Sequence, residues 1–400
     1  MARVLLVSKF RKFQGGVERH VYDLMSGLRD RGHEVRLFSS EDVEAAGGRI
    51  FSASEAGTDR VNSARALLWN TRARSLFRNV AEEFCPEVVH YHSISHQLSP
   101  SVIGAFDGPS IMTLHDYKLS APCYTLARDG EICQDCVGKV FAAPAIRYKC
   151  VAGSAAGSAI CAIEGAIHRH RYRSEIGRFI VPSRFAFDIA VRGGLPADRV
   201  SIVPWGVASA SGDFPRRANV AFYAGRFHPT KGIHILLEAW LSLPADHGCV
   251  LRVAGEGELE PLVREAASKD ATVEVLGMVP RETVMREMSS AAVAVMPSLF
   301  PETMGLSALE ALVAGTPVLS SGRGALADLS GPGVWTLPSA DAPAMRAALS
   351  SLLLQGQSEV YRRDLSKRDL SLYSLDRMIE AIEVEYVRVS DEYRTGLLGS

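Results

Sequence analysis

Residues 293–321 read VAVMPSLFPETMGLSALEALVAGTPVLSS, and this stretch decides the fold. An apolar run, VAVMPS (293–298), is followed by a loop, by leucines at helical spacing and by a second apolar run, PVLSS (317–321). Parallel strands need a crossover between them, and that crossover is usually a helix. The stretch therefore predicts a parallel β-α-β unit.

The same alternation runs from end to end, which is typical of α/β proteins with parallel sheets. Since 400 residues exceed what one core usually holds, we expect two domains. A helical pattern from Val17 to Asp30 follows the first strand. The predicted strands are RVLLVS (3–8), EVRLFSS (34–40), EVVHYH (87–92), SIMTLHD (110–116), RFIVPS (178–183), NVAFYAG (219–225), CVLRVAG (249–255), TVEVLG (272–277), VAVMPS (293–298) and PVLSS (317–321).

The domain boundary is predicted in IVPWGVASASGDFPRRAN (202–219), which is rich in Gly, Pro, Ser and Ala. It divides an N-terminal domain, 1–205, from a second domain, 206–372. Both are predicted to be Rossmann-like and doubly wound, and such sheets bind ligands at the carboxyl ends of their strands. We therefore expect the site in a cleft between the domains. A long helical pattern near the end predicts a C-terminal helix, 373–400, that packs back on the N-terminal domain.

The composition, with 47% apolar and 22% charged residues, is that of a soluble globular protein. The first 200 residues carry 26 Lys and Arg against 21 Asp and Glu, and the remainder carry 18 against 24. This asymmetry favours contact of the first half with something anionic, such as lipid phosphate. Nucleic acid is not expected, because strong basicity and stacking aromatics are lacking.

The sequence shows neither a membrane-span pattern nor a signal-peptide pattern. No stretch approaches the ~20 apolar residues of a membrane span. The start, MARVLLVSKF, is interpreted as a first strand and not as a signal peptide. Seven irregularly spaced cysteines without such a signal indicate reduced thiols, and thus a cytoplasmic protein, with peripheral contact at the inner face of the membrane as a further expectation.

Glycines and cations follow the first strand of each predicted domain. Gly15 and Gly16 open a helix, whose N-terminus favours an anion, although a plain strand-to-helix turn is the alternative. In YAGRFHPTKG (223–232), Arg226 and Lys231 flank a turn and could clamp a diphosphate; the alternative is two solvated surface charges.

Further glycines follow successive strands of the second domain, in YAG, AGEGELE (254–260) and LGMVP (276–280). Gly225 and Gly255 are the first of these glycines. Because the carboxyl ends of parallel strands meet at one edge, they predict a backbone that lies against a flat or polar ligand.

Glu302 and Glu310 stand on either side of a predicted helix start. Free N–H groups at this start would attract phosphate oxygens. Glu310 lies roughly 7 Å further along the helix axis. The alternatives are a capping carboxylate and a helix-surface charge. Because Glu310 falls among leucines, we expect it to be semi-buried, with sugar hydroxyls as its donors. A hydrolytic carboxylate pair is disfavoured, since a helix N-terminus lies between the two.

Several motifs together resemble glycosyltransferase family 4. They are Gly-Gly after the first strand, G-R-x(4)-K-G, G-E-G, and P-E-x(7)-E followed by A-G-T-P-V, and the resemblance covers nearly the whole chain. It implies the GT-B architecture of two Rossmann-like domains facing across a cleft. It also implies a retaining glycosyltransferase that uses a nucleotide-sugar.

The resemblance assigns donor-binding roles to four side chains. Arg226 and Lys231 would hold the diphosphate, Glu302 would bind hydroxyls of the donor sugar, and Glu310 would bind the ribose. The predicted catalytic residues are Arg226, Lys231, Glu302 and His115.

The resemblance also assigns backbone contacts. Met304, Gly305 and Leu306 would face the phosphates, and the Met278–Val279 segment would face the base. Gly16 would approach the β-phosphate from the other domain on closure.

Three more positions bear on the first domain. His115, in SIMTLHDY, matches the family's histidine near the donor sugar and acceptor, although a structural histidine is the alternative. Ser183-Arg184 matches a V-x-S stretch of the family. Trp205 departs from the family pattern, in which Asn is common, so no contact is assigned to it.

The predicted mechanism is front-side displacement. The leaving diphosphate would be stabilised by cations and the helix N-terminus, while the acceptor hydroxyl attacks the same face and passes its proton to a phosphate oxygen. No Asp-x-Asp occurs in the chain, so no catalytic metal is expected.

An irregular insertion at about 117–160 carries four cysteines. Cys133 and Cys136 form C-x2-C, with Cys123 before them and Cys150 after them. Four thiols could form a structural zinc site; small buried thiols are the alternative, and an iron–sulfur cluster is less favoured. The basic segment AIHRHRYRSEIGR (166–178) is interpreted either as a solvated helix face or as a contact for anionic lipid or a lipid-linked acceptor.

The predicted reaction moves a hexosyl unit from a nucleotide-diphosphate sugar to a hydroxyl of a glycan, a lipid-linked saccharide or a small-molecule glycoside. The alternatives are a sugar-nucleotide epimerase of the same architecture and a non-catalytic nucleotide-sugar-binding protein. An oxidoreductase is disfavoured, because G-x-G-x-x-G is absent after both first strands. The sugar, the base and the acceptor are not specified by the sequence.

Overall fold

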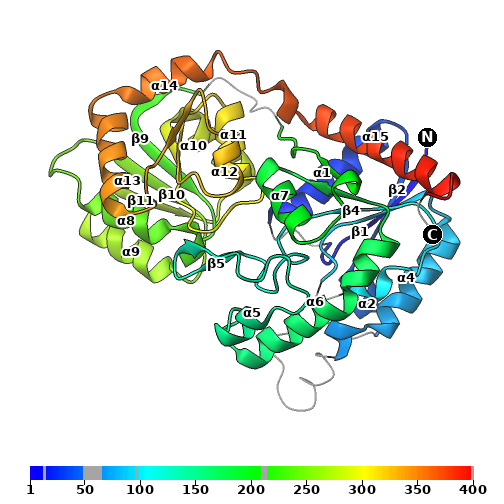
Figure 1. The fold of residues 1–400 in the computed structure, drawn as a ribbon. Coiled ribbons are helices and arrows are strands. Elements are labelled where there is room, and N and C mark those ends of the chain that lie inside the picture. Colours follow the sequence, from blue (N-terminus) through cyan, green and yellow to red (C-terminus); the bar gives the residue numbers. More distant parts are fainter. Residues whose placement is uncertain (12–14, 48–64, 96–97, 209–213, 398–400) are drawn as a thin grey trace. The chain divides into compact units, whose positions relative to one another are not determined.

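The computed structural model describes residues 1–11, 15–47, 65–95, 98–208 and 214–397. The chain forms two compact units (Figure 1). The first unit comprises residues 1–126, 134–205 and 375–400, and the second comprises 127–133 and 206–374. The division therefore falls inside the predicted linker, of which residues 209–213 lie outside the described part of the chain.

The first unit is built on a parallel six-stranded sheet in the order β2-β1-β3-β4-β7-β8. Strands β3, β4 and β7 are buried at every residue, as expected of parallel strands covered on both faces. The order reverses between β1 and β3, so the loops after these two strands diverge at a topological switch point. The strands are β1 (Arg3–Val7), β2 (Glu34–Phe38), β3 (Val88–Tyr91), β4 (Ser110–Thr113), β7 (Arg178–Val181) and β8 (Val200–Ile202).

Helices connect these strands. In α1 (Gly16–Asp30), the helix predicted after the first strand, Val21, Leu24 and Leu28 are buried on one face. The other helices of this unit are α2 (Ser40–Ala45), α4 (Thr71–Phe84), α5 (Ala143–Arg147), α6 (Ala155–Glu175), α7 (Arg184–Arg192) and α15 (Leu375–Arg394).

The second unit repeats the plan, with strand order β11-β10-β9-β12-β13-β14. Its switch point lies between β9 and β12. The strands are β9 (Arg217–Ala224), β10 (Val250–Ala254), β11 (Val273–Gly277), β12 (Ala291–Met296), β13 (Val318–Ser320) and β14 (Val334–Thr336). The helices are α8 (Ile233–Leu241), α9 (Glu260–Lys269), α10 (Arg281–Ser290), α11 (Leu306–Val313), α12 (Ala325–Asp328), α13 (Ala342–Leu349) and α14 (Gln357–Leu365).

All ten predicted strands are present, so the prediction of two doubly wound α/β units is confirmed. The β-α-β unit of residues 293–321 is β12-α11-β13, with Ala294 paired to Val318 in parallel register. The sequence missed β8 and β14. Each has three residues at the edge of its sheet, which is too short for a recognisable period.

The predicted insertion is divided between the units. The short antiparallel pair β5 (Ala127–Arg128) and β6 (Glu131–Ile132) clusters with the second unit, whereas the sequence placed all of 117–160 in the N-terminal domain. Within the second unit, Arg323 donates to the Gly130 carbonyl and pairs with the Glu131 carboxylate at 3.2 Å. The hydrogen bonds of this guanidinium explain the difference.

The C-terminal helix α15 belongs to the first unit and contacts α1 there (Figure 1, red). Gly27 permits the contact, because a Cβ at this position would lie 1.9 Å from Ile379 Cδ1. Arg178, buried at the start of β7, donates to Glu385 at 2.6 Å and to Glu392 at 2.7 Å. None of the helices in the described ranges has both the length and the apolar character to cross a membrane.

We predict that Arg178→Ala lowers the free energy of unfolding of the first unit by about 3–5 kcal/mol, because the buried carboxylate of Glu385 loses its buried charge partner and keeps only the half-exposed Arg388. Urea unfolding followed by circular dichroism measures this loss. The control is Arg394→Ala, which removes an exposed pair from the same helix and should cost less than about 0.5 kcal/mol. Equal losses in the two variants would show that the buried pair does not hold α15.

Candidate functional site

An ion pair joins the two loops at the switch point of the second unit. After β9 the chain forms a 3₁₀ turn, Pro229–Lys231, and after β12 it runs through Ser298 to Glu302. Lys231 Nζ lies 2.7 Å from Glu302 Oε1, and Ser298 Oγ donates to the same oxygen at 2.5 Å. The Leu299 backbone N–H donates to the Thr230 carbonyl at 2.8 Å. Two predicted site residues therefore meet where an open parallel sheet binds its ligand.

This pair remains accessible. The side chains of Lys231 and Glu302 keep 23% and 14% of their surface exposed, so a ligand can reach them. The Arg226 side chain is exposed and, among the described residues, forms no ion pair. Its loop is held in place by Tyr223, whose hydroxyl donates to the Arg226 carbonyl at 2.9 Å. The loop thus presents a guanidinium that is available for an anion.

Two glycines allow these loops to pack against their neighbours. Gly232 has a φ of +70°, and a Cβ there would lie 1.9 Å from the Pro297 carbonyl oxygen. Gly255 has a φ of +140°, and its Cβ would lie 2.0 Å from the Gly225 carbonyl oxygen. Close contact between backbones, which only glycine permits, explains these residues without a ligand.

Helix α11 begins beside this ion pair. Gly305 is its N-cap residue with a φ of +75°, and Leu306 is its first residue, so the free N–H groups lie directly after the Glu302 loop. Met304 is buried at 3% exposure. The other predicted donor segment, Met278–Val279, follows β11, and Met278 is 69% exposed, as a residue that covers a flat ligand would be.

Glu310 is buried within α11, as predicted, but its environment differs from the expectation. Arg281, at the start of α10, donates to Glu310 Oε1 at 2.7 Å. This guanidinium is a donor to Glu310 where sugar hydroxyls are the predicted donors. Arg281 was not predicted because the contact joins two separate helices.

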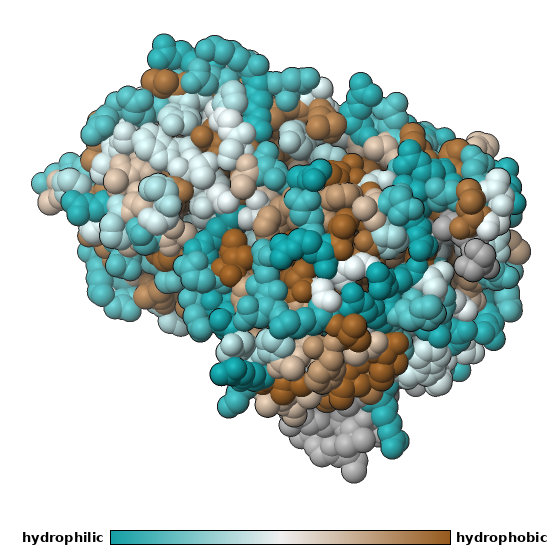
Figure 2. All heavy atoms as spheres, in the orientation of Figure 1, coloured by the Kyte–Doolittle hydropathy of each residue, from teal (hydrophilic) through white to brown (hydrophobic). Residues whose placement is uncertain are grey.

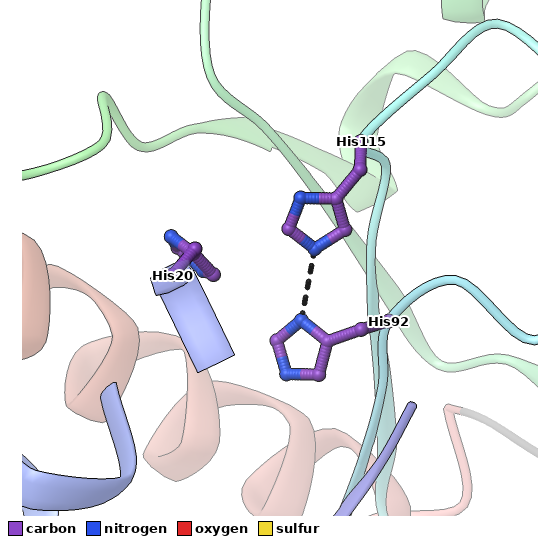
Figure 3. Close-up of side chains that lie close together, drawn as sticks. All are labelled: His20, His92 and His115. Carbon is purple, nitrogen blue, oxygen red and sulfur yellow. Dashed lines mark hydrogen bonds between the residues drawn. The ribbon is translucent and has the colours of Figure 1, made fainter. Parts of the chain in front are cut away.

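Three buried histidines face one another in the first unit (Figure 3). His20 comes from α1, four residues after Gly16; His92 follows β3, and His115 follows β4. His92 Nδ1 lies 3.0 Å from His115 Nε2, and the His20 ring centroid lies 5.1 Å from that of His115. One ring nitrogen from each lies within 4.8 Å of the others, an arrangement that could hold a metal ion. We call these three residues the histidine triad.

Burial keeps these rings neutral. It lowers the pKa of His20 to about 3, and it lowers the pKa of His92 and His115 well below the usual value, with further lowering by the neighbouring rings. Trp205 covers the triad, with its ring centroid 5.1 Å from that of His115. Trp205, which stands where the family commonly has Asn, therefore lies against His115, the predicted site histidine.

The sequence analysis found His115 and missed His20 and His92. Two signals were present in the sequence, the histidine four residues after Gly16 and the second histidine of the strand EVVHYH. Neither is informative without the fold, because most buried histidines are structural. His90 is such a residue, with ring nitrogens at 2.8 Å from the Tyr386 hydroxyl and 2.7 Å from the Thr113 hydroxyl.

The predicted zinc site of the insertion cysteines stays a prediction. Among the described residues, the four insertion cysteines do not form a group with ligand atoms close enough to share an ion. Instead Cys136 is buried in the core of the first unit, and Cys123 and Cys150 pack against that core. Apolar burial therefore holds this part of the insertion. Small partly buried thiols, the alternative, agree with the structure.

The basic segment 166–178 is mainly structural. His168 binds the Leu68 carbonyl at 2.8 Å, Arg169 donates to two backbone carbonyls, and Arg178 is the buried partner of α15. Ser183 caps α7 by accepting from the Ala186 N–H at 3.1 Å, and Arg184 pairs with Asp188 on the same helix. These contacts account for the five named residues without a ligand.

Two family models match the chain. Residues 14–131 match the model described as Glycosyltransferase Family 4, and residues 208–368 match the model described as Glycosyl transferases group 1. The first covers Gly15, Gly16 and the histidine triad. The second covers the Lys231–Glu302 pair.

Several known proteins and solved structures are similar to this chain over most of its length. A phosphatidyl-myo-inositol mannosyltransferase of Mycolicibacterium smegmatis is 28% identical over 368 residues, which cover 86% of this chain and 82% of that protein. A glycogen synthase of Mycobacterium tuberculosis is 24% identical over 342 residues, which cover 78% and 76%. The crystal structure of HepE from Anabaena in complex with UDP and glucose has a TM-score of 0.64 at 14% identity, covering 97% of this chain and 100% of that one.

We predict that Gly232→Ala destabilises the second unit more than Gly277→Ala does. Both glycines have a positive φ near +70°, which costs an alanine about 1–2 kcal/mol. At Gly277 nothing lies within 4 Å of an added Cβ, whereas at Gly232 the Pro297 carbonyl must move, at a further cost of about 1–3 kcal/mol. Equilibrium unfolding in urea measures both. Equal costs would mean that the contact between the two loops is not tight.

Proposed function

Since the chain is a family 4-like glycosyltransferase of the GT-B fold, we propose that it moves a hexosyl unit from a nucleotide-diphosphate sugar to an acceptor hydroxyl, with retention. The observation that carries the proposal is the Lys231–Glu302 pair, which joins the loops after β9 and β12 at the switch point of the second sheet. A cation and a carboxylate at this place fit a ligand that has both phosphates and hydroxyls.

On binding, the donor would replace the contact between Lys231 and Glu302 with its own contacts to each side chain. In the free enzyme the ammonium group of Lys231 and the carboxylate of Glu302 neutralise each other and hold each other in position. A diphosphate would attract Lys231 and the exposed Arg226, and Glu302 would then accept from hydroxyls of the sugar. The N–H groups at the start of α11 would face the phosphates. HepE, a structural neighbour, is named as a complex with UDP and glucose, which supports a nucleoside diphosphate as the ligand.

We propose front-side displacement as the mechanism. The bond between the anomeric carbon and the diphosphate oxygen breaks, and the acceptor oxygen bonds to the same face of that carbon. The proton of the acceptor hydroxyl passes to the departing phosphate oxygen. Arg226 and Lys231 stabilise the charge that develops on the diphosphate, the role that preorganised cations play in other group transfers. With these two cations in place, transfer should need no divalent metal.

The acceptor would lie on the side of His115. Relatives named for phosphatidyl-myo-inositol and for glycogen indicate that both lipid and glycan acceptors occur among similar proteins. A lipid-linked acceptor is favoured by the surface around α6. Figure 2 shows apolar residues gathered over the α5–α6 region. We use the name α6 patch for four exposed apolar side chains of this region, Val140 and Phe141 before α5 and Ile163 and Ile167 on α6, which are 69%, 47%, 40% and 61% exposed.

Cations lie near the α6 patch. Lys139, Arg147 and Lys149 are exposed, and Arg169 of α6 donates to the Lys139 carbonyl at 3.0 Å, which fixes that segment beside the helix. Exposed aliphatic side chains with lysines and arginines beside them are the combination that binds anionic lipid surfaces. This combination supports a peripheral contact of the first unit with a membrane that holds the acceptor.

A sugar-nucleotide epimerase of the same architecture would use the same donor contacts. It would return an altered donor and no new glycoside. Product analysis therefore separates the two activities.

We predict that Lys231→Ala lowers kcat/KM for transfer by about 10²–10³, because the leaving diphosphate loses a cation. The measurement is release of nucleoside diphosphate together with mass spectrometry of the glycoside. The control is Lys269→Ala, which removes an exposed i,i+4 pair on α9 and should leave transfer unchanged. A donor should also raise the melting temperature of the wild-type protein by mass action, and less so for Lys231→Ala. Full activity of Lys231→Ala would contradict the proposal.

We predict that Phe141→Ser with Ile167→Ser weakens binding to vesicles that contain anionic lipid by at least about tenfold, since two exposed apolar side chains no longer enter the lipid. Co-sedimentation with such vesicles at low salt measures this. Val360→Ser, an exposed position on α14 of the second unit, is the control and should bind as the wild type does. Lack of binding by the wild type, or equal binding by all three proteins, would contradict the proposal that the acceptor is linked to a lipid.

A further inference from the structure

We propose that the histidine triad of the first unit is a binding site for a transition-metal ion of the zinc class. His20, His92 and His115 come from three different elements and turn their rings toward one another (Figure 3). One ring nitrogen from each lies within 4.8 Å of the other two. Imidazole nitrogen is a preferred ligand of such ions, and three histidines with one open position form a well-known coordination pattern.

Unpartnered ring nitrogens point to a ligand. Within the part of the chain that the structure describes, neither ring nitrogen of His20 has a hydrogen-bond partner, and Nε2 of His92 has none. Both rings are buried, at 4% and 0% exposure. Buried polar atoms in native proteins are almost always paired, so each exception requires an explanation. A metal ion would supply the partner that His20 lacks.

His90 provides a contrast within the same sheet. It is buried as deeply as His92 and stacks on it, with ring centroids 4.3 Å apart. Both of its nitrogens are hydrogen-bonded, to Thr113 and Tyr386. Burial in this core therefore does not by itself leave a histidine without partners. His90 holds the His92 ring in place, as groups around a metal ligand usually do.

The geometry needs little change to accept an ion. His92 Nδ1 and His115 Nε2 lie 3.0 Å apart, and two nitrogen ligands of a tetrahedral zinc ion lie ~3.3 Å apart for bonds of ~2.0 Å. The proton now shared by these nitrogens would move to the other nitrogen of its own ring. Each ring would then offer a lone pair to the metal without a change in its charge. A further rotation of the His20 ring would bring one of its nitrogens to the ion.

The charges near the triad act in both directions. Lys9 lies close enough for its charge to lower the pKa of His115, so it opposes a cation. Asp116 follows His115 in the chain, and its carboxylate would favour a cation; burial raises the pKa of this carboxyl, and a backbone hydrogen bond and the charge of Lys9 offset part of that rise. The three nitrogen donors therefore decide the binding, and an ion that prefers oxygen ligands, such as Mg²⁺, should not bind.

Binding is tested on the full chain, purified without a histidine tag and stripped with EDTA. Titration with Zn²⁺ by calorimetry should give one ion per chain, and Co²⁺ should give the intense visible absorption of a tetrahedral site. His20→Gln should weaken the affinity by more than about 100-fold, because even residues around a metal ligand are worth 10–100-fold. The control is His170→Gln, an exposed histidine on α6, which should bind as the wild type does.

Thermal melting serves as a second readout and shows that the variants are folded. Zn²⁺ should raise the melting temperature of the wild type and of His170→Gln, but not that of His20→Gln. If His20→Gln fails to fold, His115→Gln takes its place in both measurements. The proposal is overturned if the wild type binds no stoichiometric ion, or if a folded triad variant binds with unchanged affinity.

One consequence rests on the proposed function. An ion beside His115 would occupy the place assigned to the acceptor side, so equimolar Zn²⁺ should inhibit transfer and EDTA should restore it. Binding without inhibition would leave the metal site intact and overturn only its position at the acceptor. Because binding is measured without any sugar substrate, its failure is distinguishable from failure of the transferase proposal.

Discussion

Parallel pairing of the strands is the constraint on which the rest of this structure depends. Every strand pair in both six-stranded sheets is parallel, so each strand leaves its sheet at the same edge and the chain returns through a crossover, usually a helix. At a switch point two such loops diverge and leave room for side chains. Lys231 and Glu302 meet at the switch point of the second sheet, and His20 and His92 meet at that of the first. The Lys231–Glu302 pair and the histidine triad therefore both follow from the parallel connection of the strands.

The two groups differ in how their polar atoms are satisfied. Lys231 and Glu302 are partly exposed and neutralise each other, so a phosphate and a sugar can replace either partner at little cost. The histidine triad is buried and neutral, and two of its nitrogens on His20 have no partner among the described residues. The first arrangement suits a ligand that enters and leaves with each turnover. The second suits one that stays.

Much of the second-unit site was predictable because its signals are local. Arg226, Lys231 and Glu302 are identified by their spacing after apolar strands, and the structure places them in the loops that follow β9 and β12. Arg281 was missed, because its contact with Glu310 joins two helices and has no counterpart in spacing. The zinc site of the cysteines stays a prediction. C-x2-C is a local signal, but the insertion is held by apolar packing, and its thiols do not gather in the described structure.

The sequence by itself determined the order of strands and helices, the two-unit plan and the identity of the loops that carry cations and carboxylates. These follow from hydrophobic periodicity and from glycine and proline positions, which act over a few residues. Only the tertiary structure decided which side chains are partners. It joined α15 to the first unit through Arg178 and brought three histidines from distant segments together. It also left both ring nitrogens of His20 without a hydrogen-bond partner among the described residues. Burial and pairing depend on contacts between residues far apart in the chain, and those contacts are absent from any local pattern.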